Sequence, residues 1–297
     1  MSSRIAPALL LFILSPFVGE LLLGDLTPGQ LIVFPLLALL YGGGAVFIRE
    51  LARRTRRGWP TILILALTYG IIEEAFVTQS LFNPNYLGLH LLNYGFIPGL
   101  GIGAPWTVYV LTLHVVWSIS VPVALTEALF WSRRTTPWLH GFGFSVSAIL
   151  FVLGALLMGL GELVQFHFVA STAQFTVSAI IIVILIIAAF VAFPAARTAS
   201  TARRAFTGVD HLEPQLTSHP WLFGILALLS ASAFFLLMNF GSSILYLPAA
   251  ITVLLMLALE AAVFVLVIRA SLKKGGLIYI YSPCLQVLCS PIAGLAS

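Results

Sequence analysis

Thr68-Tyr-Gly-Ile-Ile-Glu73-Glu74-Ala-Phe-Val-Thr78-Gln79 is an apolar stretch that carries two adjacent carboxylates. Placing one carboxylate at membrane depth costs roughly 2.5–3.5 kcal/mol on insertion scales. Two adjacent carboxylates therefore need partners, protonation or a wet cavity once the chain is folded. The fold and the function of the chain are expected to depend on what Glu73 and Glu74 face.

The composition is that of a membrane protein. The chain of 297 residues is 60% hydrophobic and only 8% charged, whereas about a quarter of the residues of a soluble domain are charged. We therefore expect an integral membrane protein surrounded by the lipid bilayer. The net charge of +4 arises from 14 Lys and Arg residues that lie in short segments between apolar stretches. This distribution encodes membrane topology and argues against a nucleic-acid partner.

Eight apolar segments predict an all-α, polytopic transmembrane helix bundle. They cover approximately residues 5–23, 31–48, 60–79, 106–131, 139–168, 175–193, 221–240 and 245–268. Residues 83–105 contain too many Pro, Gly and Asn residues for a spanning helix, which favours a re-entrant or interfacial loop. The bundle forms one domain over residues 1–274. The apolar tail over residues 275–297 suggests no role, and its Cys284 and Cys289 are interpreted as ordinary thiols.

The basic residues predict the orientation of the bundle. The strongest signal is the group of five arginines between residues 49 and 57. If the N-terminus is cytoplasmic, alternation of eight spans places all 14 basic residues on the cytoplasmic side. Both termini are therefore expected to be cytoplasmic, with the protein in the plasma membrane. Glu127 is expected to lie near enough to Arg133 and Arg134 to pair with them.

Several polar side chains are expected in the outer half of the bundle. The paired glutamates lie roughly 8–9 Å from the outer end of their segment, and His114 lies roughly 12 Å from the outer end of the next, at 1.5 Å per residue. Positions 117 and 118 share the helix face of position 114, because residues three and four apart are neighbours on a helix. The candidates for a shared site are Glu73, Glu74, His114, Trp117, Ser118, Glu162 and His167.

These residues resemble the motifs of the CAAX-protease and bacteriocin-processing family of intramembrane endopeptidases. The first motif of that family is EExxxR, which Gly70-Ile-Ile-Glu73-Glu74 resembles. A later helix of the family carries FxxxH and another carries HxxxN or HxxxD, and His114 and His167 fall at the corresponding histidines. The resemblance implies proteolysis within the membrane, acting on a membrane protein or a lipidated peptide.

The resemblance also implies a role for each matched residue. Glu73 would activate water as the general base, with Glu74 and His114 as its partners, while His167 and Ser171 would form the oxyanion side of the site. The chain departs from the family pattern at three positions, where Thr78, Val110 and Ser171 replace the motif Arg, Phe and Asn or Asp. The replacement of the Arg removes a cation from beside the paired carboxylates.

A metal-dependent site is an alternative that the residue types allow. Glu74, His114 and His167 could hold a divalent ion such as zinc, and the remaining glutamate would act as the base. The same residues could also work without a metal. The side chains expected to surround and support the site are then Thr78, Trp117, Ser118 and Glu162.

Two further classes of function remain open. Glu20 and Glu260 have no evident partner in the sequence, and carboxylates on several helices are typical of a transporter with a proton or cation relay. A catalytically inactive scaffold is the third possibility, in which Glu73 and Glu74 make an interhelical contact. A protease predicts polar groups that converge on one pocket, whereas a transporter predicts a polar track toward both faces. A scaffold predicts neither arrangement.

Overall fold

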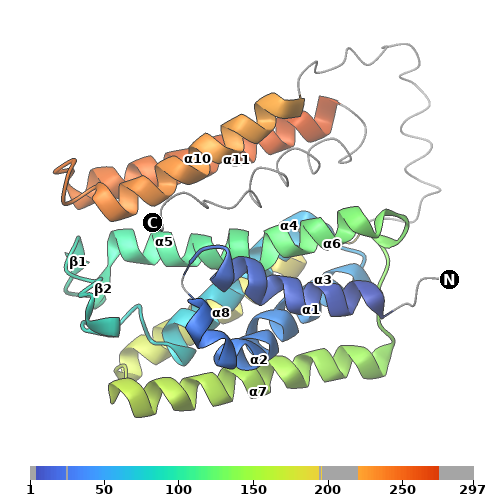
Figure 1. The fold of residues 1–297 in the computed structure, drawn as a ribbon, viewed down its shortest axis with the longest axis horizontal. Coiled ribbons are helices and arrows are strands. Elements are labelled where there is room, and N and C mark those ends of the chain that lie inside the picture. Colours follow the sequence, from blue (N-terminus) through green and yellow to red (C-terminus); the bar gives the residue numbers. More distant parts are fainter. Residues whose placement is uncertain (1–4, 25, 194, 196–219, 274–297) are drawn as a thin grey trace.

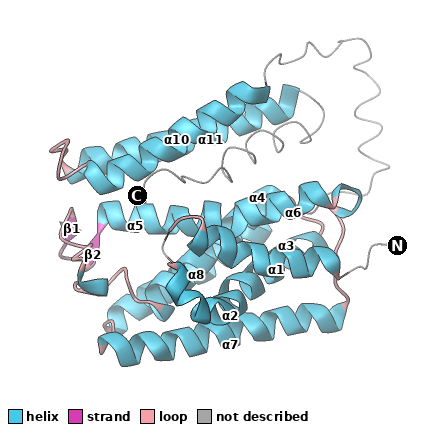
Figure 2. Ribbon diagram, viewed as in Figure 1, coloured by secondary structure: helices cyan, strands magenta, loops and turns pink. Residues whose placement is uncertain are grey.

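The computed structural model describes residues 5–24, 26–193, 195 and 220–273. The described chain is almost entirely helical, and Figure 2 shows its two short strands at one end of the molecule. The longer elements are α1 (Ala6–Pro16), α2 (Phe34–Leu37), α3 (Gly43–Arg54), α4 (Trp59–Ile72), α5 (Ala104–Leu113), α6 (Val121–Leu129), α7 (Gly141–Phe166), α8 (Thr172–Val191), α10 (Pro220–Phe240) and α11 (Ala249–Lys273). The predicted tail over residues 275–297, with Cys284 and Cys289, lies outside the described residues.

Five helical segments are long and apolar enough to cross a membrane: Gly29–Arg54, Trp59–Val77, Ala104–Leu129, Gly141–Phe166 and Thr172–Val191. Three shorter helices are also apolar: Ala6–Leu21, Gly224–Phe240 and Ala249–Val265. All eight segments lie where the sequence predicts spans. The all-α, multi-pass architecture is thereby confirmed, while the count of eight spans and the orientation of the termini stay predictions.

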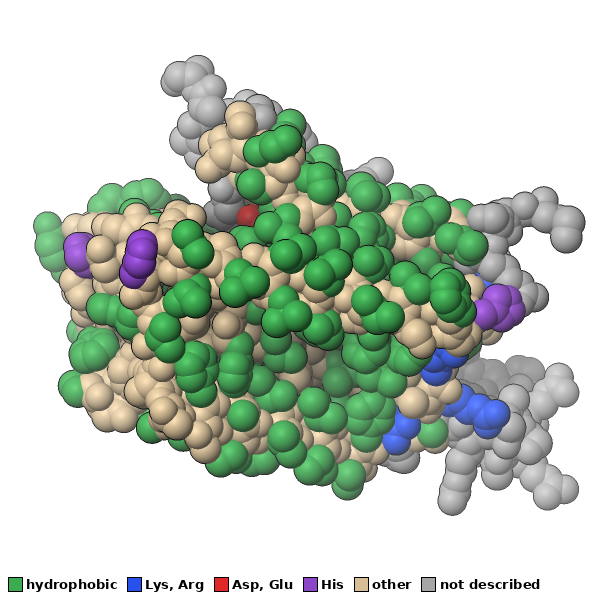
Figure 3. Space-filling view, turned by 90° about the horizontal axis from the view of Figure 1, so that it is seen from below, with side chains coloured by type: hydrophobic (Ala, Val, Ile, Leu, Met, Phe, Trp, Pro, Cys, Tyr) green, Lys and Arg blue, Asp and Glu red, His purple; other side chains and the backbone are tan. Residues whose placement is uncertain are grey.

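The helices differ in how far they are enclosed by the rest of the bundle (Figure 1). In the most apolar part of Trp59–Val77, which contains α4, 67% of the residues are buried, against 11% for both α7 and α8. Figure 3 shows hydrophobic side chains over most of the face seen from below, with Lys and Arg side chains gathered at one end. The apolar outer surface suits lipid, and the positive-inside rule predicts that the basic end faces the cytoplasm.

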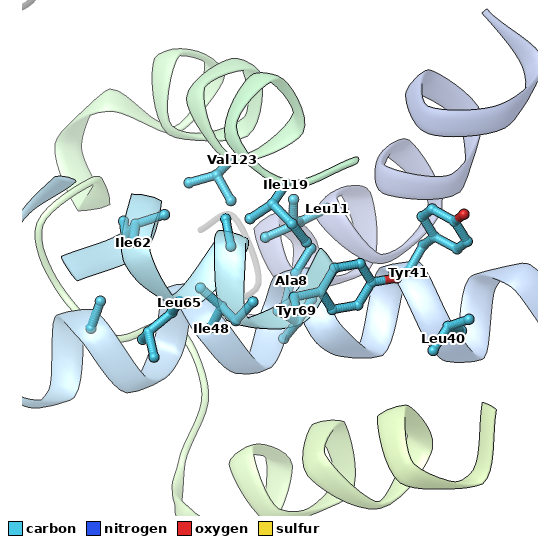
Figure 4. Close-up of a cluster of buried hydrophobic side chains, with 14 of the residues drawn as sticks. Ala8, Leu11, Leu40, Tyr41, Ile48, Ile62, Leu65, Tyr69, Ile119 and Val123 are labelled. Atoms are coloured by element: carbon cyan, nitrogen blue, oxygen red, sulfur yellow. The ribbon is translucent and has the colours of Figure 1, made fainter. Parts of the chain in front are cut away.

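The glycine triplet Gly42-Gly43-Gly44 allows three helices to approach one segment closely, as small residues do between membrane helices. A Cβ on Gly43 would lie 2.7 Å from the backbone nitrogen of Phe151 in α7, and a Cβ on Gly44 would lie 2.6 Å from the ring of Tyr69 in α4. Figure 4 shows Tyr69 and Tyr41 among the buried side chains that these helices enclose. The triplet therefore fixes where the Tyr69 ring can lie.

Four helices of the bundle contain a π-helical turn, in which one extra residue widens the helix. These turns are η1 (Phe17–Leu21), η3 (Ala38–Gly42), η4 (Glu73–Val77) and η6 (His114–Ser120). Three of them carry Glu or His, namely Glu20 in η1, Glu73 and Glu74 in η4, and His114 in η6, while η3 carries Tyr41. Such turns are frequent at functional sites because they change the direction in which neighbouring side chains point.

The broken stretch over residues 83–103 forms a loop and no long helix, as the sequence predicts. It contains the 3₁₀ turn η5 (Tyr86–Gly88) and the antiparallel strands β1 (Phe96–Ile97) and β2 (Ile102–Gly103). The Tyr94 hydroxyl donates a hydrogen bond of 2.7 Å to the carbonyl oxygen of Leu247, between α10 and α11. Figure 1 shows this loop at the start of α5, at the end of the bundle away from the end of α6, so it covers the predicted outer side.

A buried ionic network, which we call the arginine cluster (Arg49, Glu50, Arg53 and Glu127), holds the basic end together. Arg49 binds Glu127 at 3.0 Å and Glu50 at 2.8 Å, and Arg53 binds Glu127 at 2.7 Å. The remaining Arg49 donors reach the backbone carbonyl oxygens of residues 133, 134 and 136. The partners of Glu127 are thus two arginines of α3, while Arg133 and Arg134 contribute backbone oxygens to the network.

Candidate active site

The two adjacent glutamates and His114 meet between α4 and α5. Glu73 and Glu74 begin the π-helical turn η4, and His114 begins η6. The helices come close because position 70 is glycine, where a Cβ would lie 3.1 Å from the Cβ of His114. His114 Nε2 lies 2.6 Å from Glu74 Oε1, and His114 Nδ1 lies 3.3 Å from Glu73 Oε2. All three side chains are buried, so the imidazole bridges two carboxylates inside the bundle.

The Glu74 carboxylate is held in one orientation. Its Oε2 accepts hydrogen bonds from the Thr78 hydroxyl at 3.0 Å and from the Ser80 hydroxyl. The indole N–H of Trp106 donates to the Ser80 oxygen at 3.2 Å, which orients that hydroxyl toward Glu74. With His114 on Oε1, both oxygens of this carboxylate are occupied. Thr78, at the position of the motif Arg, therefore contacts the carboxylate as a neutral donor.

The Glu73 carboxylate has fewer partners. Among the described residues its Oε2 finds no partner in hydrogen-bond geometry, because the contact with His114 lacks that geometry. The Tyr69 hydroxyl is buried and lies close enough to Glu73 to interact with it, although no described atom accepts from it in full hydrogen-bond geometry. The Tyr69 and Tyr41 rings lie 5.8 Å and 6.0 Å from the His114 ring, between centroids. Most buried polar atoms in proteins are paired, so two unpaired ones at one place mark a candidate site.

Glu20 is a further candidate for the site, for which the sequence alone indicates no partner. It lies in η1, and its carboxylate interacts with the Tyr41 hydroxyl and with the charge of His114. The Ser15 hydroxyl in the same helix donates a hydrogen bond of 2.6 Å to the carbonyl oxygen of Ser118, which holds this helix next to the site. A carboxylate in an apolar helix was the only signal in the sequence, and it did not indicate which helix Glu20 faces.

The other predicted supporting residues lie at different distances from the site. The Ser118 hydroxyl is 3.2 Å from His114 Nδ1, whereas Trp117 packs its ring against Phe235 of α10 at 5.2 Å. Glu162 of α7 is near enough to interact electrostatically with both glutamates of η4, and its Oε2 has no hydrogen bond. Ser118 and Glu162 therefore border the site, while Trp117 faces the neighbouring helix.

The structure does not bring His167 and Ser171 to the two glutamates. His167 is exposed at the C-terminal end of α7, where its backbone adopts a left-handed conformation with φ of 50°. Ser171 is also exposed, and its hydroxyl caps α8 by accepting the backbone N–H of Gln174 at 3.3 Å. The predicted metal set of Glu74, His114 and His167 is thus replaced by a different trio. Glu73, Glu74 and His114 offer ligand atoms that all lie within 4.8 Å of one another.

Glu260, the other carboxylate without a predicted partner, lies away from this trio. It belongs to α11 and accepts a hydrogen bond of 2.5 Å from the Thr112 hydroxyl of α5. Thr112 and His114 are two residues apart, so they point to different sides of their helix. Glu260 therefore links α11 to the bundle at a separate place.

The fold and the site together define a multi-pass helical membrane protein with a buried cluster of two glutamates and a histidine at its centre. A family model matches residues 9–288, and the chain belongs to that family, which is described as an uncharacterized membrane protein family. No curated protein and no solved structure matches the chain.

Proposed function

We propose that the protein is an intramembrane endopeptidase that activates a water molecule at Glu73, Glu74 and His114. The observation that carries the proposal is the difference between the two carboxylates. Glu74 has hydrogen-bond partners on both oxygens, whereas Glu73 keeps a buried oxygen without one. An acceptor with spare capacity inside an apolar bundle is what a general base for water requires.

The roles follow from these contacts. Glu73 takes a proton from the water, whose oxygen forms the new bond to the carbonyl carbon of the peptide. The proton then passes to the amine nitrogen as the C–N bond breaks, so no other reactant is consumed. Glu74 orients the His114 imidazole through the 2.6 Å contact, and the imidazole keeps the two carboxylates apart. The general base contributes about 10²–10⁴-fold to such a reaction.

The oxyanion side of this site differs from the one that the family resemblance implies. His167 and Ser171 are exposed, which removes them from the candidates for that role. Tyr69 is a buried donor near Glu73, and its hydroxyl has no acceptor in full hydrogen-bond geometry among the described residues. Its hydroxyl is suited to donate to an oxygen that becomes negative during the reaction.

The substrate class follows from the position of the site. The trio is enclosed by spanning helices, and the predicted orientation places it in the outer half of the membrane. A transmembrane segment of another protein, unwound near its outer end, therefore suits the site better than a prenylated cytoplasmic peptide. The polar groups converge on one place, and Glu260 is bonded to Thr112 elsewhere. This arrangement favours hydrolysis over the transporter and scaffold alternatives.

The test is a cleavage assay in proteoliposomes with a library of fluorogenic peptides that each contain one transmembrane segment. We expect Glu73→Gln to lower the rate of any cleaved peptide by at least about 10²-fold, because glutamine cannot accept the proton. Glu260→Gln, a matched change of a membrane carboxylate outside the trio, should leave the rate unchanged. Equal rates for the wild type and Glu73→Gln would contradict the proposal, as would a library in which nothing is cleaved.

A further inference from the structure

We propose that Glu73, Glu74 and His114 form a binding site for one divalent metal ion of the zinc type. The inference concerns the same site as the proposed function and rests on it for the chemical role of the ion. The ligand atoms come from two helices and lie within 4.8 Å of one another. Zinc binds carboxylate oxygen and imidazole nitrogen at about 2.0–2.2 Å, so the three side chains must close around the ion when it binds.

The net negative charge of the site favours binding of a divalent cation. Among the described residues, Glu73 and Glu74 form ion pairs only with His114. Two carboxylates with one imidazole retain net negative charge even when the imidazole is protonated, and such charge is unfavourable inside a membrane. A divalent ion balances the charge of two carboxylates and a neutral imidazole, so these three ligands and the ion together are neutral. Thr78 stands where the related motif has an Arg, so the chain itself offers no substitute cation there.

The surrounding side chains already orient the ligands. Thr78 and Ser80 bind the Oε2 of Glu74 and leave its Oε1 directed toward the histidine. The Ser118 hydroxyl lies 3.2 Å from His114 Nδ1, which suits the outer hydrogen bond that metal-binding histidines make. Glu127 and Glu50 of the arginine cluster, by contrast, already have their charge compensated by arginines.

A second observation points to a ligand at the same place. The Tyr69 hydroxyl is buried next to Glu73, and no described atom accepts from it in full hydrogen-bond geometry. Three protein ligands leave the fourth position of a tetrahedral ion open, as in catalytic zinc sites. A water molecule in that position would give the Tyr69 hydroxyl a partner. Glu73 can bind the ion through one oxygen and accept the water proton with the other, so its two roles are compatible.

The test measures metal binding without any peptide substrate. The full-length protein is purified in detergent, treated with a chelator, and titrated with Zn²⁺ and separately with Co²⁺. We expect about one equivalent of Zn²⁺ by elemental analysis, and a Co²⁺ absorption spectrum of the four-coordinate kind. Glu73→Gln, Glu74→Gln and His114→Ala should each weaken Zn²⁺ binding at least tenfold. His167→Ala and Glu260→Gln should bind as the wild type does.

Each outcome decides the inference. Failure of the folded wild type to bind Zn²⁺ or Co²⁺, with folding checked by its thermal unfolding curve, overturns it. Equal binding by Glu73→Gln and Glu74→Gln, which preserve side-chain shape, also overturns it. If the wild type binds no metal but Glu73→Gln abolishes peptide cleavage, the metal site falls and the proposed function stands. If binding depends on the trio but no peptide is cleaved, the metal site stands and the proposed function falls.

Discussion

Two buried clusters of charged side chains lie in the same helix bundle, and their partners differ. In the arginine cluster, Arg49 and Arg53 face Glu50 and Glu127, so the charges balance. All five N–H donors of the Arg49 guanidinium have an acceptor, and Trp138 stacks on that guanidinium at 3.4 Å. This cluster leaves nothing for a ligand to bind.

The cluster of Glu73, Glu74 and His114 is built in the opposite way. Two carboxylates share one imidazole, and the side chains of Glu73 and Tyr69 each keep a buried polar atom without a hydrogen bond. A fully paired buried network stabilises one structure, while a partly paired one lowers stability unless a ligand completes it. The comparison supports a structural role for the arginine cluster and agrees with the chemical role that we propose for the glutamate–histidine cluster.

The largest expected effect comes from breaking the arginine cluster. Arg49→Met removes one member, so Glu50 loses its closest arginine and Glu127 keeps only Arg53, which lowers the free energy of unfolding by about 3–5 kcal/mol. Denaturation in mixed detergent micelles measures this change. Arg56→Met, at an exposed arginine two residues beyond α3, serves as the control and should change stability by about 0.5 kcal/mol or less.

Glu73→Gln is the matched change in the other cluster. Because it removes a carboxylate that lacks a counter-charge, the metal-free protein should lose no more than about 1 kcal/mol of stability, or gain some. A loss as large as that of Arg49→Met would show that both clusters are structural. The contrast that assigns them different roles would then be wrong.

A smaller effect is expected at the glycine that makes room for Tyr69. A Cβ on Gly44 would lie 2.6 Å from the Tyr69 ring, so Gly44→Ala must displace that ring relative to His114. Overpacking of this kind lowers stability by about 1–3 kcal/mol. We also expect weaker Zn²⁺ binding and slower cleavage, because the Tyr69 hydroxyl moves.

Gly161→Ala is the control for this prediction. Gly161 lies in α7 with open space around its Cα, so alanine there should keep function and raise stability by about 0.5–1 kcal/mol. Stability, Zn²⁺ affinity and cleavage rate are measured on both variants. A Gly44→Ala protein with normal metal affinity and rate would mean that the position of Tyr69 does not matter to the site.

The sequence predicted how far along its helix each polar side chain lies better than it predicted which way the side chain points. Apolar length located all the described spans, and depth alone placed Glu73, Glu74 and His114 together, as the structure has them. The directions depend on π-helical turns, which change the facing of every later side chain and have no simple sequence signature. Glu20 could not be assigned to the site for this reason, since it lies within such a turn.

Two placements were readable from the sequence and were missed. Glu162 and His167 are five residues apart, which puts them roughly 140° apart around a helix at 3.6 residues per turn. They could not face one site together from a continuous helix. Ser171-Thr-Ala-Gln174 is a capping-box pattern, which predicts that a helix begins at residue 172 and that the Ser171 hydroxyl is occupied.

The smallest expected effect is at His167. This prediction tests the position of His167 in the structure against the role that the family resemblance implies. His167 ends α7 in a left-handed backbone conformation with φ of 50°, which glycine adopts without strain. His167→Gly should therefore raise the free energy of unfolding by up to about 1 kcal/mol and leave cleavage and Zn²⁺ binding unchanged. The resemblance implies instead that this histidine binds the oxyanion, and its loss would then abolish cleavage. A stable His167→Gly protein without activity would thus show that α7 brings its end to the site during catalysis, and that the trio alone is incomplete.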